Sequence, residues 1–230
     1  MEWEFANSMC GRFAFYSPAE ATAALFGADG SIDLKPRYNI APTQYIAAIR
    51  NDEHNDRELT AFRWGLVPFW AKDPSIGNRM INARAETVAE KPSFRNAYRK
   101  RRCLVLADGF YEWHTEGGVK VPYFISLASG EPFAFAGLWE HWQSKESDES
   151  LQTTTIVTTA ANDFLSQLHH RMPVVLEPGN ADRWLAGDMA LLEDISRDGP
   201  TFRAWPVDRK VNNARNESDD LADPAGDPIS

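Results

Sequence analysis

Four runs of β-branched and aromatic residues in the second half of the chain constrain its fold more than any other feature. Such residues favour extended strands, because their side chains pack well on a pleated surface. Turns rich in glycine, serine or polar residues separate the runs, which is typical of antiparallel strands joined by short connections. The four runs are Cys103–Ala107, Val121–Leu127, Phe133–Trp139 and Thr153–Thr159.

Further strands and short helices are predicted on both sides of this region. Ser17 and Pro18 form a helix start and Gly27 a helix stop, so we expect a helix over 18–26. The other predicted strands are 10–16, 45–50, 59–66 and 202–207, and the other predicted helices are 92–100, 162–168, 181–185 and 189–196. Neither a repeat nor a change of composition divides the body of the chain. This predicts a single α+β domain with a curled, largely antiparallel, barrel-like β-sheet flanked by short helices.

The two ends of the chain differ from its body in charge. Of the formal net charge of −9, seven negative charges lie in residues 1–8 and 217–230, which contain no Lys or Arg. We expect residues 1–8 to be a leader that is absent or removed in the mature protein. Residues 217–230, rich in Asp, Pro, Gly and Ser, are expected to be a disordered acidic tail. The domain itself is expected to span residues 9–216.

Composition excludes several classes of protein. With only Cys10 and Cys103, neither a disulfide framework nor a cysteine zinc site is expected. No apolar run approaches the roughly 20 residues needed to cross a membrane, and residues 1–8 lack the features of a signal peptide. Metal-ligand spacings and phosphate-binding glycine-rich loops are also absent from the sequence. We therefore expect a cytoplasmic, monomeric protein (nucleoid-associated if bacterial) with no metal and no cofactor.

Cys10, directly after Met9, is the first candidate for chemistry. If translation starts at Met9 and this methionine is removed, Cys10 carries a free α-amine beside its thiol. The two groups have reference pKa values of about 8 and 8.5, so both are partly deprotonated near neutral pH. The amine can form an imine with an aldehyde, and the thiol can close on the imine carbon to give a thiazolidine, which an internal cysteine cannot form. The alternative is a small buried residue in an N-terminal strand.

Three other polar residues lie in apolar or tightly turned surroundings. Glu112, placed between aromatic residues directly after a predicted strand, is expected to have a raised pKa that suits proton transfer; the alternative is a salt-bridged strand end. His169 is either a general acid/base or a residue that satisfies helix-terminal carbonyls. Asn82 by itself indicates no more than a stabilised turn.

A basic run gives the body of the chain one further feature. It predicts either a phosphate-binding track or a solvated helix face, and the sequence does not decide between them. The run comprises Arg95, Arg99, Lys100, Arg101 and Arg102.

Six motifs, in the same order along the chain, together resemble the SOS-response-associated peptidase (SRAP) family, which includes the abasic-site processing proteins. They cover nearly the whole body from Met9 to Asn216, which makes the match far more specific than any single pattern. The motifs are Met9-Cys-Gly-Arg-Phe13, Arg37-Tyr-Asn-Ile-Ala-Pro42, Trp64-Gly-Leu-Val-Pro-Phe-Trp70, Ile81-Asn-Ala-Arg-Ala-Glu-Thr87, Ala107-Asp-Gly-Phe-Tyr-Glu-Trp113 and Leu168-His-His-Arg-Met-Pro173.

The resemblance implies a sensor of abasic sites in single-stranded DNA that crosslinks itself to the lesion through Cys10 as a thiazolidine. In this reading Asn82 orients the amine and the captured sugar, and Glu112 transfers protons. His169 acts as acid/base on the sugar ring oxygen and in crosslink reversal. Strand cleavage by β-elimination (AP-lyase activity) and self-cleavage that exposes the cysteine are also implied.

The resemblance further implies which partners and contacts to expect. Single-stranded DNA with abasic sites and proteins of the replication fork are the implied partners, in protection of the lesion during the SOS response. The implied DNA contacts are Arg12, Arg37, Asn39, Pro42, Trp70, Arg84 and Arg171.

Two other functions stay open at this point. A thiol peptidase would use Cys10, His169 and Glu112 as nucleophile, base and orienting group. A non-covalent reader of modified or damaged DNA would use the basic run and the aromatic loop at 68–70. The chain also departs from the family pattern, in which the cysteine follows the initiator methionine, and we expect Met9 to be the biological start.

Overall fold

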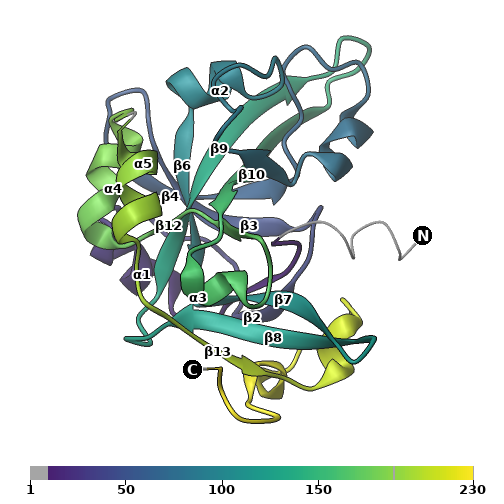
Figure 1. Cartoon of the computed structure of the whole chain (residues 1–230). Coiled ribbons are helices and arrows are strands. Elements are labelled where there is room, and N and C mark those ends of the chain that lie inside the picture. The colour runs from purple at the N-terminus through teal and green to yellow at the C-terminus, as the bar shows by residue number, and fades with distance from the viewer. Residues whose placement is uncertain (1–9, 189, 230) are drawn as a thin grey trace.

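Two β-sheets share one core in the computed structural model of the protein, which describes residues 10–188 and 190–229 (Figure 1). The first sheet has five strands in the order β13-β8-β7-β1-β2. Its neighbouring strands are antiparallel. The strands are β13 (Phe202–Pro206), β8 (Val119–Leu127), β7 (Gly109–Glu116), β1 (Phe13–Phe15) and β2 (Arg37–Ile40).

The second sheet closes on itself. Its path runs β11-β10-β4-β3-β6-β9-β12, and β10 also pairs with β9, so β10, β4, β3, β6 and β9 form a closed ring. β5 joins it by pairing in parallel with β10. The strands are β3 (Tyr45–Asn51), β4 (Arg57–Trp64), β5 (Asn82–Arg84), β6 (Arg102–Ala107), β9 (Phe133–Gln143), β10 (Ser150–Ala160), β11 (Arg171–Pro173) and β12 (Val175–Leu176).

Short helices lie outside the sheets (Figure 1). In the described part of the chain, none of them combines the length and apolar character needed to cross a membrane. The α-helices are α1 (Ala19–Leu25), α2 (Arg95–Lys100), α3 (Asp163–Ser166), α4 (Pro178–Leu185) and α5 (Leu191–Asp198). Three 3₁₀ helices are η2 (Pro74–Arg79), η3 (Arg209–Asn212) and η4 (Asp219–Ala222).

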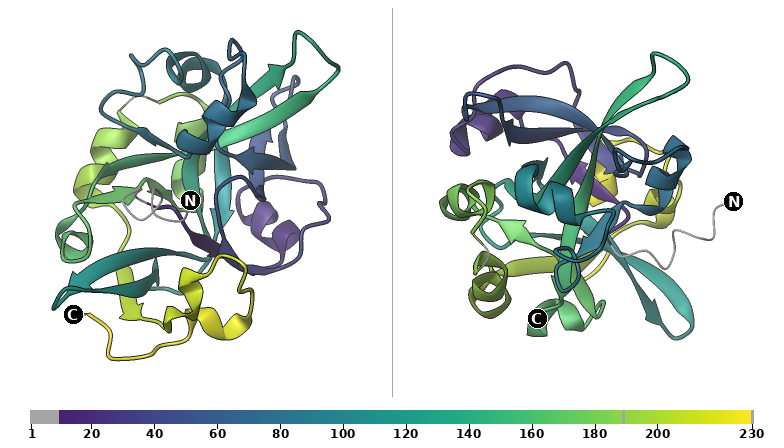
Figure 2. Two further views of the ribbon diagram at one scale, coloured as in Figure 1. Left: turned by 90° about the vertical axis from the view of Figure 1, so that its right-hand side faces the viewer. Right: turned by 90° about the horizontal axis from the view of Figure 1, so that it is seen from above.

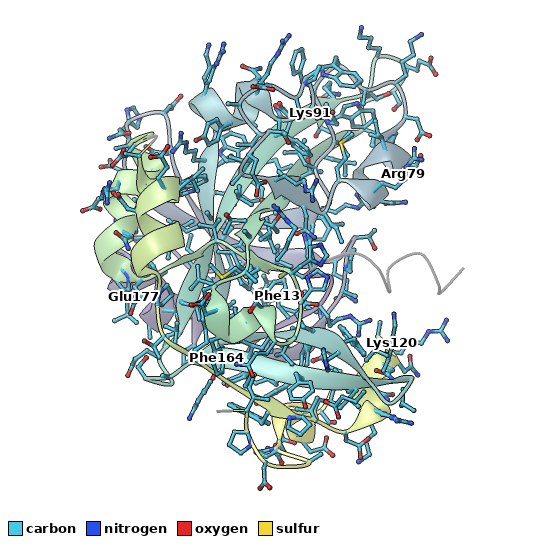
Figure 3. The ribbon with its side chains drawn as sticks, viewed as in Figure 1. Phe13, Arg79, Lys91, Lys120, Phe164 and Glu177 are labelled. Atoms are coloured by element: carbon cyan, nitrogen blue, oxygen red, sulfur yellow. The ribbon has the colours of Figure 1, made fainter. Side chains whose placement is uncertain are left out.

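Buried aromatic rings join the two sheets. Phe13, near the middle of the molecule in Figure 3, packs edge-on against Trp64 and Phe135 with ring centroids 5.2 and 5.6 Å apart. Phe110 packs against Phe135 at 5.9 Å in the same manner. Edge-to-face pairs of this kind add about 0.5–1.5 kcal/mol beyond the burial of their surface. β1 of the first sheet thereby packs against the second sheet, so the chain just before β1 lies near the contact between the two sheets.

The predicted fold class is confirmed, and the four runs correspond to β6, β8, β9 and β10 within a few residues. One expectation was wrong. Glu112, expected in the connection after a strand, lies inside the next strand, β7.

The acidic tail is also corrected, because residues 217–229 pack onto the first sheet instead of being disordered. Leu221 of η4 is fully buried in a cluster with Tyr111, Phe124 and Val211. The backbone amide of Ala225 donates to the carbonyl of Pro206 at 2.8 Å. The expected leader and the expected start at Met9 lie outside the described residues.

Candidate active site around Cys10

A direct hydrogen bond joins Cys10 to Glu112, two residues that are 102 positions apart. The amide nitrogen of Cys10 donates to Oε1 of Glu112 at 2.8 Å, and both residues are buried. The antiparallel pairing of β1 with β7 explains this contact, since Phe13 lies opposite Phe110 and the amide of Tyr111 donates to the carbonyl of Arg12. Stepping back from β1 therefore means stepping forward along β7, which brings Cys10 to Glu112.

Burial raises the pKa of Glu112 to about 7, and hydrogen bonds from the amides of Cys10 and Trp113 oppose the shift. The direction agrees with the expectation from its aromatic neighbours. A carboxyl group with a pKa near the working pH is present in both protonation states and can therefore give and take a proton in turn.

The thiol of Cys10 is held in its protonated form. Burial, and after it the charge of Glu112, raises the pKa of this thiol well above its ordinary value. A thiol of this kind reacts as a nucleophile only when a neighbouring group takes its proton. Glu112 contacts the backbone nitrogen of Cys10 and its charge acts on the thiol, which makes Glu112 the candidate proton acceptor.

His169 has partners for either of its neutral tautomers. Its Nδ1 lies 3.2 Å from the amide nitrogen of Arg171 and 3.3 Å from the carbonyl oxygen of the same residue. An unprotonated Nδ1 can accept from the amide of Arg171, and a protonated Nδ1 can donate to the carbonyl of Arg171. Because either tautomer has a partner, Nε2 can carry the hydrogen and act as an acid, or lack it and act as a base. Desolvation is the largest cause that lowers the pKa of His169, which keeps the ring neutral near pH 7.

His114 connects the Glu112 strand to the His169 loop, and sequence reasoning missed it. Its Nδ1 lies 3.2 Å from the carbonyl oxygen of Leu168, the residue before His169. A carbonyl only accepts hydrogen bonds, so Nδ1 must carry the hydrogen. The sequence held one signal for His114. Residues two apart on a strand point to the same face, and His114 comes two residues after Glu112.

The segments that contain Asn82 and Arg171 both pair with the same strand, β10. Asn82 lies opposite Ile156 in the parallel pair with β5, and Arg171 lies opposite Ala160 in the antiparallel pair with β11. These pairings fix the backbone position of Asn82 beside β10, and its role toward Cys10 stays a prediction.

The two arginines at this edge differ in exposure. Arg84 is exposed. Arg171 is buried, donates to both carboxylate oxygens of Glu86 at 2.7 and 3.0 Å, and donates to the carbonyl of Thr158 at 2.8 Å. Of the two, only Arg84 presents its charge to solvent in this structure.

Arg12 and Asn39, both predicted DNA contacts, hold the C-terminal segment. Nη1 of Arg12 donates to Oδ1 of Asn39 at 2.6 Å and to the carbonyl of Val211 at 3.0 Å. Nδ2 of Asn39 donates to the carbonyls of Asn213 and Asn216 at 3.0 and 2.9 Å. The side chain of Asn39 is fully buried and its carboxamide is thus taken up by the fold itself.

Pro42 and Trp70 occupy turns at the surface. Phe69 and Trp70 are the central residues of a turn closed by the hydrogen bond from the amide of Ala71 to the carbonyl of Pro68, and they are 53% and 45% exposed. Such exposure excludes a core role for Trp70 and leaves its ring available for stacking. Pro42 is half-buried in the connection before β3.

The basic run is divided by the structure. Arg102 is buried between the rings of Tyr98 and Trp184, at 4.3 and 4.4 Å from their centroids, and Arg101 pairs with Glu140 at 2.7 Å. Arg95, Arg99 and Lys100 are exposed. Arg101 and Arg102 therefore make contacts within the protein, which favours a structural role for these two residues over DNA binding.

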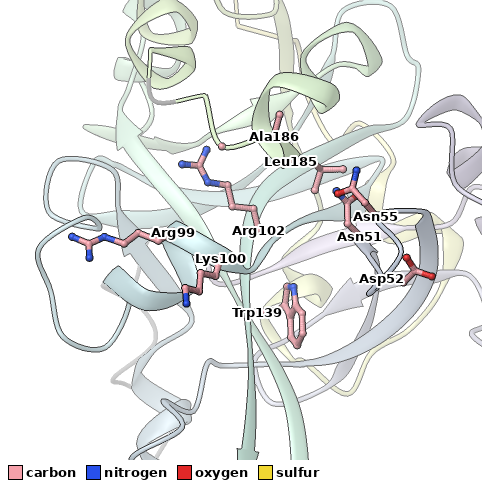
Figure 4. A pocket seen from close by; sticks show the side chains of 10 residues that line it. Asn51, Asp52, Asn55, Arg99, Lys100, Arg102, Trp139, Leu185 and Ala186 are labelled. Atoms are coloured by element: carbon pink, nitrogen blue, oxygen red, sulfur yellow. The ribbon is translucent and has the colours of Figure 1, made fainter.

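A cavity of about 220 Å³ lies beside this run (Figure 4). The cavity lies at the Asn51 end of β3, and the predicted DNA contact Pro42 comes just before the opposite end, at Tyr45. The two ends of the strand are about 20 Å apart, so the cavity is separate from Pro42. No set of three His, Cys, Asp or Glu residues in the described part of the chain is arranged to hold a metal ion. The cavity is lined by Asn51, Asp52, Asn55, Arg99, Lys100, Arg102, Trp139, Leu185, Ala186 and Gly187.

Together, the closed sheet and the buried cysteine–carboxyl pair define an α+β domain built around residues near its N-terminal strand. The family model described as SOS response associated peptidase (SRAP) matches residues 9–214, and the chain belongs to this family. The abasic site processing protein YoaM of Bacillus subtilis is 42% identical over 94% of this chain and 98% of its own length. YedK of Escherichia coli, also named an abasic site processing protein, is 34% identical over 94% of this chain and 100% of its own.

More distant relatives share the same domain. The abasic site processing protein HMCES of Gallus gallus is 32% identical over 80% of this chain and 65% of its own length. A crystal structure of a Bacteroides thetaiotaomicron protein superposes with a TM-score of 0.82 at 27% identity, covering 94% of this chain and 100% of that one. The similarity therefore extends over the fold as well as the motifs.

Proposed function

We propose that this chain processes abasic sites in single-stranded DNA by covalent capture, in the form that begins at Cys10. The α-amine attacks the aldehyde of the ring-opened sugar and water leaves, which gives an imine. The thiol sulfur then bonds to the imine carbon and closes the thiazolidine ring. The observation that carries the proposal is the 2.8 Å contact between the Cys10 nitrogen and Glu112.

Glu112 completes the proton balance of this sequence. In its acid form it protonates the hydroxyl group of the carbinolamine, which leaves as water and gives the imine in its protonated form. The resulting carboxylate accepts the thiol proton as sulfur attacks, and the acid form is restored. A pKa of about 7 makes both half-steps accessible near neutral pH.

His169 and Asn82 complete the proposed site by analogy with the family motifs. His169 exchanges a proton with the ring oxygen of the sugar, which opens the ring and exposes the aldehyde. Because Nδ1 has a donor and an acceptor within reach, the same residue can also serve reversal of the crosslink. Asn82 orients the amine and the captured sugar. The imine also permits β-elimination, so AP-lyase activity is part of the proposal.

In this proposal, two exposed groups hold the DNA strand. Arg84 is available for a phosphate, and Trp70 presents an open aromatic face to a base beside the lesion. Stacking on such a ring contributes about 1–3 kcal/mol per base without reading sequence. This fits a protein that recognises a lesion in many sequence contexts.

The proposal is tested with two chains, one starting at Cys10 and one retaining residues 1–9, mixed with an oligonucleotide that holds a single abasic site. We expect the first to form an adduct that survives denaturing electrophoresis, with a mass equal to protein plus DNA less one water. The second is expected to form none unless it is trimmed, which intact mass reports. Equal adduct on an untrimmed chain would contradict the need for the free amine.

The same experiment separates the other two functions. A thiol peptidase fits less well, because such enzymes lower the pKa of the reactive thiol and here it is raised. Turnover of a peptide substrate by the chain that retains residues 1–9 would restore that possibility. A non-covalent reader would give a complex that dissociates on denaturation and is unchanged by substitution of Cys10.

A further inference from the structure

The carboxylate of Glu217 occupies a set of anion-binding groups on β2. Its Oε1 accepts hydrogen bonds from the amides of Tyr38 and of Asn39, the latter at 3.1 Å, and its Oε2 accepts from Nε of Arg37 at 2.6 Å. The side chains of Arg37 and Glu217 are 31% and 30% exposed. This is therefore an ion pair at the surface, open to exchange with an anion from solution.

Successive main-chain amides beside a guanidinium group are also the donors that proteins use for phosphate. Phosphodiester oxygens are commonly bound by arginine side chains and by backbone N–H groups, which position the strand without reading its bases. A carboxylate and a phosphodiester both present two oxygens to such donors. The residues around Glu217 thus form a site whose chemistry fits one DNA phosphate.

This site adjoins the proposed active site. β2 pairs with β1, with Ile40 opposite Phe13 and Arg37 opposite Phe15. Phe15 is five residues from Cys10, so the two backbones lie at most about 18 Å apart. A strand captured at Cys10 therefore needs to extend only a short way to bring one of its phosphates to Arg37.

The C-terminal segment can release Glu217 without leaving the sheet. Asn39 binds the carbonyls of Asn213 and Asn216, and Leu221 is buried on the other side of Glu217. Both flanks stay anchored while the Glu217 side chain rotates outward. The segment, yellow in Figures 1 and 2, runs along the first sheet and carries five acidic residues and no basic ones from Glu217 onward.

We propose that Arg37 and the amides of Tyr38 and Asn39 form a phosphate site for the DNA strand, and that Glu217 fills this site when no DNA is bound. The proposal rests on the proposed function for the source of the phosphate, a single strand. Because Glu217 competes with the strand, it weakens binding of undamaged DNA, which is not held covalently.

The first test measures binding of an undamaged single-stranded oligonucleotide across a range of salt concentrations. Glu217→Gln is expected to bind about fivefold more tightly at low salt. Its plot of log K against log salt is expected to be steeper by about 0.7, the value for one additional phosphate contact on single strands. Asp223→Asn, which removes the same charge from the same segment, is the matched control and should leave the slope unchanged. The double variant Arg37→Gln, Glu217→Gln should lose the gain.

The second test uses inorganic phosphate and backbone amide NMR signals, and does not depend on DNA. Phosphate added to Glu217→Gln should shift the signals of Tyr38 and Asn39, and the same concentration should not shift them in the unaltered protein. If Glu217→Gln fails to fold, Glu217→Asp replaces it. Its shorter side chain should also allow phosphate to shift the amide signals of Tyr38 and Asn39.

Equal slopes for the Glu217 and Asp223 variants, or no amide shift with phosphate, would overturn the proposal. Neither undamaged DNA nor phosphate can form a thiazolidine. Failure of crosslinking would thus leave these results unaffected, and their failure would leave crosslinking unaffected.

Discussion

Cys10 and Cys103 are both fully buried, but in the described part of the chain only Cys10 has a carboxyl group as its neighbour. Burial raises the pKa of both thiols, that of Cys103 to about 12. Cys103 lies within the closed sheet, with Sγ 3.3 Å from Oγ1 of Thr154. Cys10 lies against the carboxyl group of Glu112.

The comparison shows that exposure does not separate the cysteine proposed to react from the cysteine that packs inside the closed sheet. A hydroxyl group such as that of Thr154 can accept or donate a hydrogen bond, but it does not take up a proton near neutral pH. A carboxyl with a pKa of about 7 does. The neighbouring carboxyl group is what sets Cys10 apart in this structure, and the proposed form that begins at Cys10 adds a free α-amine.

The strongest way to break this comparison is to remove each thiol in turn. In the chain that starts at Cys10, Cys10→Ala should abolish the crosslink to abasic DNA. Cys103→Ala should retain it and lose about 1–2 kcal/mol of stability, because it leaves a small cavity. Denaturing electrophoresis and urea unfolding measure the two effects. Crosslinking lost equally in both variants would show that the two cysteines are not functionally distinct.

Glu112→Gln tests whether the proton acceptor is the deciding difference. The amide keeps a hydrogen-bond acceptor for the Cys10 nitrogen but can neither give nor take a proton. We expect the single-turnover crosslinking rate to fall by about 10²- to 10⁴-fold, the usual contribution of a general acid/base. Glu116→Gln, on the exposed end of β7, is the matched control. A rate for Glu112→Gln close to that of the control would assign proton transfer to another group.

The same substitution should stabilise the protein above neutral pH. The pKa of Glu112 is about 7 in the folded state and about 4.5 when unperturbed, so the folded state binds the extra proton between these values. Stability therefore falls as pH rises through this window, by on the order of 3 kcal/mol in total. Glu112→Gln should lack this fall and should be more stable than the unaltered protein at pH 8. Identical unfolding curves at pH 5 and pH 8 in both proteins would contradict the raised pKa.

Strands with a local signature were predictable from the sequence, and those set by distant partners were not. β6, β8, β9 and β10 are rich in β-branched and aromatic residues, which mark buried strands. β7 contains Gly109, Glu112 and His114, and its conformation depends on pairing with β1 and β8. The acidic tail was misread for a similar reason, since the contacts of Leu221 are made with residues far away in the sequence.

The candidate site was predictable only as far as its residues carry recognisable chemistry. Glu112 was identified from its aromatic neighbours, and Cys10 from its place after Met9. Their contact spans 102 positions and follows from sheet register, which no local pattern contains. His114 was missed because its partner is a backbone carbonyl, and any residue supplies one.

Gly137→Ala sharpens the comparison from the side of Cys103. A Cβ atom at this position would lie 2.7 Å from Sγ of Cys103, which is closer than atoms of this kind approach. The strands β6 and β9 must therefore separate locally, at a cost of about 1–3 kcal/mol, the usual range for overpacking. Thermal unfolding should record the loss, and crosslinking at low temperature should be unchanged. If Cys103→Ala is introduced as well, part of the loss should be recovered, because the clashing sulfur is gone.

His114→Asn is expected to have the smallest effect, and it tests how far the surroundings of Cys10 extend. The imidazole joins β7 to the carbonyl of Leu168 and so positions the loop of His169, but it makes no contact with the reacting atoms in the proposal. Loss of one such hydrogen bond is worth about 1 kcal/mol, or roughly fivefold in rate. His54→Asn, at the exposed turn between β3 and β4, is the matched control. A purely structural role would lower the melting temperature alone. A positioning role should also displace the limb of the pH–rate profile that His169 governs, and His114→Gln, whose longer amide can again reach the carbonyl, should restore it in part.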